Sequence, residues 1–212
     1  MSKSLREKLK AKREPPRHDA IANFSKTLQC PIDWATFKDP VIASDGHTYE
    51  RFHLHCWFNR SQDPLYGYPL SPLTGERLKS RSVVSNYCIS AIAKVWTTDP
   101  DPLPKMMQLV QCPLSKLPFT DPVVACDGNS YEKGQISRVL TQKAENGFPV
   151  SPVTGQPMYL KTLVSNVVLK RVVKGLEELK GLDLSGYDRL KKEAVHVTAI
   201  SVESLGDALF EF

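Results

Sequence analysis

The sequence predicts an α+β fold built from two tandem copies of one small module. Three observations predict it: a long internal repeat, turn signals typical of a β-hairpin in each copy, and two stretches of helical apolar spacing around a loop. A repeat of this kind indicates two copies of one domain rather than a single larger one. The 212 residues are enough for two such modules of about 70 residues each.

The repeat consists of blocks in which residue types return in the same order. Residues 30–50 return 82 positions later as residues 112–132, with Cys-Pro, Asp-Pro-Val, Asp-Gly and Tyr-Glu in the same places. Residues 71–75 return 80 positions later as residues 151–155, both beginning Ser-Pro. Because both copies must build the same fold, the positions at which they differ carry information about function.

The elements of the first copy begin with a hairpin. Residues 41–49 combine β-branched residues with the dipeptide Asp45-Gly46, which predicts two short strands joined by a two-residue turn. We expect Gly46 and its counterpart Gly128 to adopt a positive φ in these turns.

A helix is expected directly after the hairpin. Thr48 is the candidate N-cap for a helix that starts near Glu50. Leu54 and Phe58 are four residues apart, so they lie on one face of this helix and are expected to point into the core.

A final helix is expected after a second loop, with Asn86 or Ser85 as its cap. Its apolar residues recur at the same spacing in both copies: Cys88, Ile89, Ile92, Ala93 and Trp96 in the first, and Val168, Leu169, Val172, Val173 and Leu176 in the second.

These elements divide the chain into five parts. We expect a basic flexible tail at 1–24, the first module at 25–96, a Pro-rich linker at 97–107, the second module at 108–180 and a C-terminal tail at 181–212. Three prolines close together predict a stiff, extended linker.

Composition excludes several classes of protein. Five cysteines without a CxxC pair or a Cys/His pair at zinc spacing argue against disulfides and a metal site, so no metal or cofactor is expected and a reducing, intracellular compartment fits best. No apolar run reaches the length of a membrane span, and the start is too charged for a secretory signal. The net charge of +5 resides in the first 18 residues. RNA binding by this tail is an alternative, but a solvated tail is favoured and nucleic acid is not an expected partner.

One set of ordered positions resembles the U-box family of ubiquitin ligases. In the first copy the residues that carry the resemblance are Cys30-Pro31-Ile32, Asp39-Pro40-Val41, Gly46, Tyr49-Glu50-Arg51, Leu54, Trp57, Pro72-Leu73-Thr74 and Asn86. The resemblance covers most of residues 28–180. It implies two zinc-free, RING-like modules in which polar and salt-bridge networks replace the metal.

The resemblance also implies an activity. U-boxes bind a ubiquitin-conjugating enzyme (E2) that carries ubiquitin as a thioester, and they favour ubiquitin transfer to a lysine of a protein substrate. We therefore expect E2, ubiquitin and a protein substrate as partners, and no catalytic residue that forms a covalent intermediate.

Family positions identify four candidate E2-binding residues in the first copy. Ile32 matches the first-loop contact, Pro72 the second-loop contact, and Trp57 lies on the central helix at the edge of its apolar face. Trp34 follows Ile32 where the family often has another apolar contact. An ordinary packing role is the alternative for each of them.

The second copy differs at both tryptophans. Its equivalent surface is Leu114, Val139 and Pro152, and Lys116 replaces Trp34. Since this copy has neither tryptophan, the fold does not require them. We therefore expect the first box to recruit E2. The second box is expected to bind substrate or another partner.

Two alternatives to this ligase interpretation remain. Many active U-boxes have a basic residue directly after Pro-x-Thr, where this chain has Gly75 and Gly155, so a non-catalytic adaptor built from two U-box-like folds is the main rival. A thioester-forming ligase using Cys56 beside His53 and His55 is disfavoured, because neighbouring helix positions point in different directions.

The compact double box also resembles secreted bacterial effectors such as those of Legionella. A small eukaryotic U-box protein is an equally compatible interpretation. Either one places the protein in the cytoplasm of a eukaryotic cell, the host in the bacterial case, with the nucleus as a further option.

Overall fold

The computed structural model describes residues 17–61, 67–141 and 147–180. The first repeat unit contains α2 (Arg17–Thr27), β1 (Pro40–Ile42), β2 (Thr48–Glu50), α3 (Arg51–Arg60), β3 (Val84–Ser85) and α4 (Tyr87–Thr98). The second contains α5 (Pro102–Leu109), β4 (Pro122–Val124), β5 (Ser130–Glu132), α6 (Lys133–Thr141), β6 (Val164–Ser165) and α7 (Val167–Lys180). Each unit has one antiparallel sheet, ordered β2-β1-β3 or β5-β4-β6. The predicted α+β class is confirmed.

The hairpin is present, but its turn differs from the prediction. The Ala43 N–H donates to His47 O at 3.1 Å and the Gly46 N–H donates to Ala43 O at 3.0 Å, so three residues lie between the paired positions. Hairpin loops of this length need a residue with positive φ at their end, and Gly46 has φ of 82°. The expected glycine conformation is therefore confirmed, and the two-residue turn is wrong.

The central helix α3 points Leu54 and Phe58 into the core, as predicted. Thr48 does not cap it. The Thr48 side chain is buried and its hydroxyl accepts a hydrogen bond from Asn86 Nδ2 at 3.0 Å. The N-cap residue is Glu50, whose side chain makes no capping hydrogen bond.

The final helices follow the predicted pattern. Asn86 caps α4 by accepting a hydrogen bond from the Ile89 N–H, and Asn166 caps α7 by accepting one from the Leu169 N–H. The predicted apolar positions are buried, except that Cys88 and Val173 are only partly so.

Two helices lie where the sequence predicted none. Residues 17–24, expected in a flexible tail, belong to α2, and residues 102–107, expected to be extended, belong to α5. Pro102 is the first residue of α5, where a missing N–H costs nothing because that group has no intrahelical partner. Helix α5 is the counterpart of α2, since Thr27 and Leu109 are 82 positions apart. Residues 1–16 and 181–212 lie outside the described residues, and so do most of the basic side chains of the tail.

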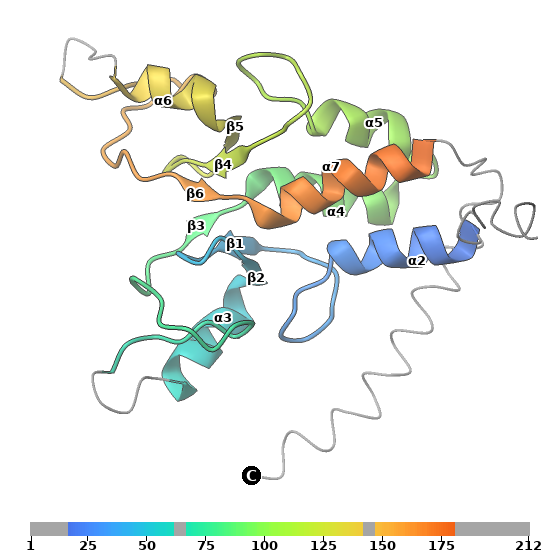
Figure 1. The fold of residues 1–212 in the computed structure, drawn as a ribbon, viewed down its shortest axis with the longest axis horizontal. Helices are drawn as coiled ribbons and strands as arrows, with labels where there is room; N and C mark the ends of the chain where they lie inside the picture. Colours follow the sequence, from blue (N-terminus) through green and yellow to red (C-terminus); the bar gives the residue numbers. More distant parts are fainter. Residues whose placement is uncertain (1–16, 62–66, 142–146, 181–212) are drawn as a thin grey trace, which may run out of the picture.

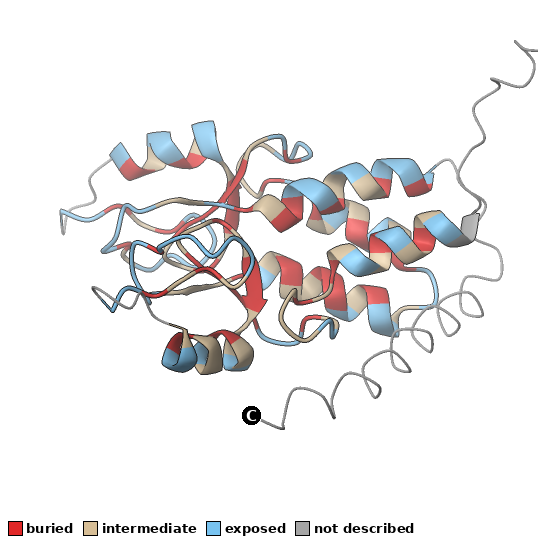
Figure 2. Ribbon diagram, turned by 60° about the horizontal axis from the view of Figure 1, so that its bottom comes forward, coloured by how far each residue is buried: buried red, intermediate tan, exposed pale blue. Residues whose placement is uncertain are grey.

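The first helix of each unit packs on the last helix of the other unit. Helix α2 of the first unit packs on α7 of the second, and α5 of the second packs on α4 of the first (Figure 1). Gly175 of α7 allows this approach, because a Cβ there would lie 2.7 Å from the Phe24 ring of α2. The red, buried stripes of these helices face one another in Figure 2. One core therefore spans both units, and it includes Ile21, Phe24, Ile89, Ile92, Trp96, Met106, Leu169, Val172 and Leu176.

A polar contact also joins the units. Asn86 Nδ2 donates to Asn166 Oδ1 at 3.2 Å and Asn166 Nδ2 donates to Asn86 Oδ1 at 3.1 Å, and both side chains are fully buried. The Tyr87 N–H donates to Gly128 O and the Val167 N–H donates to Gly46 O. Each unit makes the same contacts to the other, which is the pattern expected of an approximate two-fold arrangement within one chain.

Candidate functional site

Two loops of the first unit share one backbone geometry. We call residues 29–36 the first loop and residues 70–77 the second loop. The equivalent hydrogen bonds run from Cys30 N to Ala35 O and from Trp34 N to Cys30 O in the first loop, and from Ser71 N to Glu76 O and from Gly75 N to Ser71 O in the second. Trp34, with φ of 59°, therefore occupies the position that Gly75, with φ of 70°, has in the second loop.

Trp34 combines a costly backbone conformation with exposure. A positive φ is uncommon for a large side chain, and 59% of the Trp34 surface is exposed. Its counterpart Lys116 has the same conformation, with φ of 58°. The fold therefore demands the backbone geometry in both units but not the indole, which supports a role for the Trp34 side chain on the surface.

Trp57 connects the central helix to the second loop. Its Nε1–H donates to Leu70 O at 2.9 Å, and the ring is half-buried. One helical turn before Trp57, His53 Nδ1 lies 3.0 Å from Asp33 Oδ2 of the first loop. Helix α3 thus adjoins both loops, and the segments that carry the four predicted E2-binding residues adjoin one another.

The predicted residues differ in how far they are exposed. Ile32 and Trp57 are half-buried and pack against the main core, so each contributes both to stability and to the surface. Pro72 is half-buried in the second loop. Sequence reasoning did not select Leu73, which is 48% exposed beside Pro72, or Phe52, which is 70% exposed on α3. Phe52 could have been found as an apolar residue that lies off the apolar face of its helix.

In the second unit the equivalent surface lacks the hydrogen bond that Trp57 makes to the second loop. Leu114 is half-buried and Pro152 is exposed. Val139 is half-buried at the position of Trp57, but it has no side-chain donor, so the bond from the central helix to the second loop cannot form.

A buried phenol holds the hairpin against the second loop in each unit. Tyr49 donates its hydroxyl to Asp45 Oδ2 at 3.0 Å and lies 3.2 Å from Ser71 Oγ. Tyr131 likewise donates to Asp127 Oδ2 at 2.6 Å. Burial raises the pKa of both phenols far above their ordinary value, so they remain neutral donors.

Carboxylates tie β2 and the start of α3 to the residues that lead into β1. Glu50 accepts hydrogen bonds from the backbone N–H groups of Lys38 and Asp39 at 3.0 and 2.9 Å. The Arg51 guanidinium binds both oxygens of Asp39 and donates to Ser85 Oγ at 2.8 Å. These contacts form a polar and salt-bridge network of the kind that the family resemblance implies.

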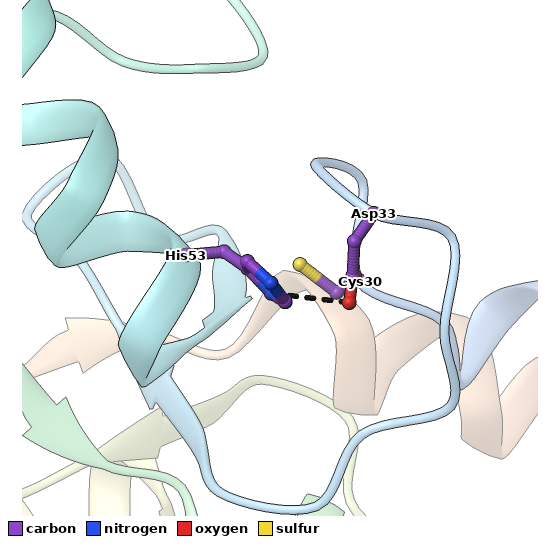
Figure 3. Close-up of side chains that lie close together, drawn as sticks. All are labelled: Cys30, Asp33 and His53. Atoms are coloured by element: carbon purple, nitrogen blue, oxygen red, sulfur yellow. Dashed lines mark ion pairs between the residues drawn. The ribbon is translucent and has the colours of Figure 1, made fainter. Parts of the chain in front are cut away.

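One group of possible metal ligands is present in the described part of the chain. It consists of Cys30, Asp33 and His53, whose ligand atoms all lie within 4.8 Å of one another (Figure 3). A search for Cys and His spacing missed it, because one of the three ligands is an aspartate. Burial raises the pKa of the Cys30 thiol to about 11.

The two histidines beside Cys56 have other neighbours. His53 faces Asp33, and the His55 ring packs edge-on against Phe58. The geometry therefore gives no support to a Cys-His nucleophile at Cys56.

Comparison with known proteins settles the family. The U-box domain model matches residues 25–99 and 109–178, which is more than half of the chain. The chain belongs to the U-box family. This double U-box protein is accordingly of the RING-type E3 ubiquitin transferase class.

Several curated U-box proteins are similar to the chain. The E3 ubiquitin-protein ligase LubX of Legionella pneumophila strain Paris is 29% identical over 173 residues, covering 69% of this chain and 69% of LubX. LubX of strain Philadelphia 1 is 29% identical over 171 residues, and the match covers 66% of that protein. U-box domain-containing protein 1 of Medicago truncatula is 32% identical over 74 residues, which is 35% of this chain and 10% of the plant protein.

The helices described for this U-box protein are also informative about membranes. None of them within the described ranges is both long and apolar enough to span a bilayer.

Proposed function

We propose that this U-box protein recruits a ubiquitin-charged E2 through its first box and promotes ubiquitin transfer to a substrate lysine. The supporting observation is the difference between the boxes. On the same backbone, the first box presents Trp34 and Trp57 where the second has Lys116 and Val139. Exposed or half-buried tryptophans on adjoining loop and helix segments are typical of protein-binding hot spots.

The proposed chemistry needs no nucleophile from this chain. The substrate lysine amine attacks the thioester carbonyl, the new amide bond forms, and the E2 thiol leaves. The box restrains the charged E2 so that the thioester is presented to the amine. The hydrogen bond from Trp57 to Leu70 and the buried contacts of Tyr49 keep the docking surface rigid, which lowers the entropic cost of binding.

The second box is assigned to substrate or another protein partner. It keeps the scaffold but lacks both aromatic side chains of the first box. Helices α3 and α6, which carry Trp57 and Val139, lie apart in Figure 1, α6 at the top and α3 at the bottom, so partners on the two boxes need not compete.

The site of action follows from the partners. A protein that works on E2 and ubiquitin meets them in the cytoplasm or nucleus of a eukaryotic cell. Similarity to the Legionella protein LubX favours the interpretation of a bacterial protein that acts in the host cytoplasm.

Autoubiquitination of the full chain with purified components tests the proposal. Ile32→Ala and Trp57→Val should each reduce the rate at least tenfold, since hot-spot losses of about 2 kcal/mol or more are typical. Val is the residue of the second box at this position, so the fold tolerates it. Leu114→Ala and Val139→Ala in the second box are matched controls that should leave the rate unchanged. The reverse pattern would assign E2 recruitment to the second box.

A non-catalytic adaptor is the second candidate, and Gly75 favours it. The position after Pro72-Leu73-Thr74 has no side chain that could bridge E2 and ubiquitin. If the chain binds E2 but no enzyme in a broad E2 panel supports ubiquitin transfer, the adaptor replaces the ligase proposal.

A further inference from the structure

Three exposed apolar side chains flank residues 150–157, which are the second unit's counterpart of the second loop. A backbone hydrogen bond joins the segments that enter and leave this loop. The rings of Phe148 and Tyr159 come from these two segments, and their centroids are 5.1 Å apart. Phe148 is 43% exposed, Tyr159 is 68% exposed and the next residue, Leu160, is 63% exposed. We call Phe148, Tyr159 and Leu160 the apolar patch.

The first unit shows that the fold does not require this patch. Where the second unit has Phe148, Tyr159 and Leu160, the first has Tyr68, Lys79 and Ser80. Lys79 and Ser80 are exposed, so two positions that face water in the first unit carry large apolar side chains in the second. The ring pair contributes to folding, but this does not account for Leu160, whose side chain stays largely in water. Grouped apolar side chains on a surface are typical of a contact with another segment.

The chain itself contains a segment that suits the patch. Residues 197–212, which lie outside the described residues, have no lysine or arginine and include the acidic residues Glu203, Asp207 and Glu211. Four of their apolar residues are Val202, Leu205, Leu209 and Phe212. These four are spaced three, four and three positions apart, which is the spacing of residues on one helix face. Apolar residues in this pattern are typical of segments that bind an apolar surface.

Charge favours the same pairing. Lys161 follows the patch directly, is exposed, and is the one charged residue among residues 147–163. The segment at 197–212 has the opposite charge. An exposed ion pair adds little affinity, so the apolar contact supplies most of the binding and Lys161 helps to orient the segment.

The connection is long enough for the segment to reach the patch. Helix α7 has 14 residues, so Lys180 lies about 20 Å from Val167. Val167 follows Leu160 by seven positions, which span at most about 25 Å. The patch is therefore within about 45 Å of Lys180, whereas residues 181–196 can extend to about 55 Å.

We propose that residues 197–212 dock on the apolar patch of the same chain and cover it. Their apolar side chains lie on Phe148, Tyr159 and Leu160, and their carboxylates face Lys161. The tether keeps the segment at an effective concentration of about 1 mM, so even a weak contact is occupied most of the time. A protein that binds this face of the second box has to displace the segment first. That consequence, unlike the docking itself, rests on the proposed function of the second box.

Hydrogen exchange of the full chain tests the docking. Amides of residues 197–212 should exchange about fivefold more slowly in the wild type than in a Tyr159→Lys, Leu160→Ser double variant, given a Kd of about 0.2 mM for the untethered segment. Both substitutions take the first-unit residue at an exposed position, so the variant should fold, and its denaturation curve verifies this. Phe52→Ala removes an exposed apolar side chain from the first unit and should leave the exchange unchanged. Conversely, Leu205→Ser with Leu209→Ser should speed exchange at the amides of the patch.

Crosslinking identifies which chain supplies the segment. A zero-length carbodiimide crosslink should join Lys161 to an acidic residue of 197–212. In a mixture of isotopically light and heavy chains, the products should join chains of the same isotope. Light–heavy products would assign the patch to a second copy of the chain and overturn the proposal.

The exchange measurement can overturn the proposal independently. Equal exchange of residues 197–212 in the wild type and the folded double variant would mean that the segment does not bind the patch, which is then open to another protein. Neither measurement uses E2 or ubiquitin. Failure of the docking therefore leaves the proposed E2 recruitment standing, and failure of E2 recruitment leaves the docking standing.

Discussion

At Trp34 the backbone conformation favours glycine, but the chain carries a large exposed side chain there. The loop geometry calls for a left-handed residue, which the second loop supplies as Gly75, whereas the first loop carries an exposed indole. A left-handed conformation costs a non-glycine residue about 1–2 kcal/mol. An exposed side chain regains little of this by packing, so the benefit of Trp34 is expected in binding.

The variant Trp34→Gly separates the effect of Trp34 on folding stability from its effect on E2 binding. Relief of strain and the greater entropy of unfolded glycine nearly offset each other, so the free energy of unfolding should stay within about 1 kcal/mol of wild type. Affinity for E2 should fall, as measured by calorimetry. Chemical denaturation provides the stability value, and unchanged E2 affinity would remove Trp34 from the proposed surface.

Gly75 can be changed in the opposite sense. A Cβ at this position would meet no atom within 4 Å, so the obstacle to a side chain is the φ of 70°. Gly75→Arg should therefore lower the free energy of unfolding by about 1–2 kcal/mol. It should also speed ubiquitin discharge from a bound E2, because it supplies the basic group that many U-boxes carry here. In the control variant Gly75→Asn, the asparagine can adopt this left-handed conformation and adds no charge. This variant should therefore not speed ubiquitin discharge from E2.

At the scale of elements, the two units pair an equivalent aspartate with cations from different helices. Asp39 is paired with Arg51 at the start of α3, whereas its counterpart Asp121 is paired with Lys170 of α7 at 2.6 Å. The hydrogen bond from Lys170 lowers the pKa of the Asp121 carboxyl. Lys133 occupies the position of Arg51 in the second copy, but comparing the copies cannot show that the cation for Asp121 comes from a helix 49 residues away.

Glu132 predicts how the second unit responds to acid. Burial acts to raise the pKa of its carboxyl, but hydrogen bonds from Thr120 and Asp121 outweigh it and the pKa is lowered. A carboxyl whose pKa is lowered by folding stabilises the protein above its unfolded pKa of about 4.3, and this contribution is lost as the pH falls through the folded pKa. Glu132→Gln should therefore reduce the free energy of unfolding at pH 7. The difference from wild type should shrink below about pH 4 in urea titrations, and a constant difference would contradict this account.

At the scale of the whole molecule, the two boxes are one cooperative body. Each opening helix packs on the final helix of the other unit, and the buried Asn86 and Asn166 amides bond to each other. Separating the units would expose the helix faces of this shared core, although the second unit also has a smaller core of its own that includes Tyr131 and Ile136. Function is therefore best tested with variants of the full chain, which should unfold in a single transition.

The asparagine pair provides the test of this coupling. Asn86→Ala removes a helix cap and leaves the Asn166 amide and the Thr48 hydroxyl short of partners, which should cost about 3 kcal/mol. Asn166→Ala should cost about the same. The double variant should cost clearly less than the two single effects together, because the second change no longer breaks an intact pair. Strictly additive effects in urea denaturation would show that the units are independent.

Local chemistry in the sequence determined the repeat, the hairpins, the buried faces of α3, α4 and α7, the cap at Asn86 and the U-box family. These features depend on neighbours a few positions away, or on comparing one copy with the other. Tertiary structure decided the rest. Helices α2 and α5 gain stability by packing on the other unit, so their own residues gave little helical signal, and the prolines of α5 suggested an extended linker. The meeting of Asp33 with His53 and of Asn86 with Asn166 also depends on how the chain folds back on itself, because contacts over 20 and 80 residues leave no local pattern.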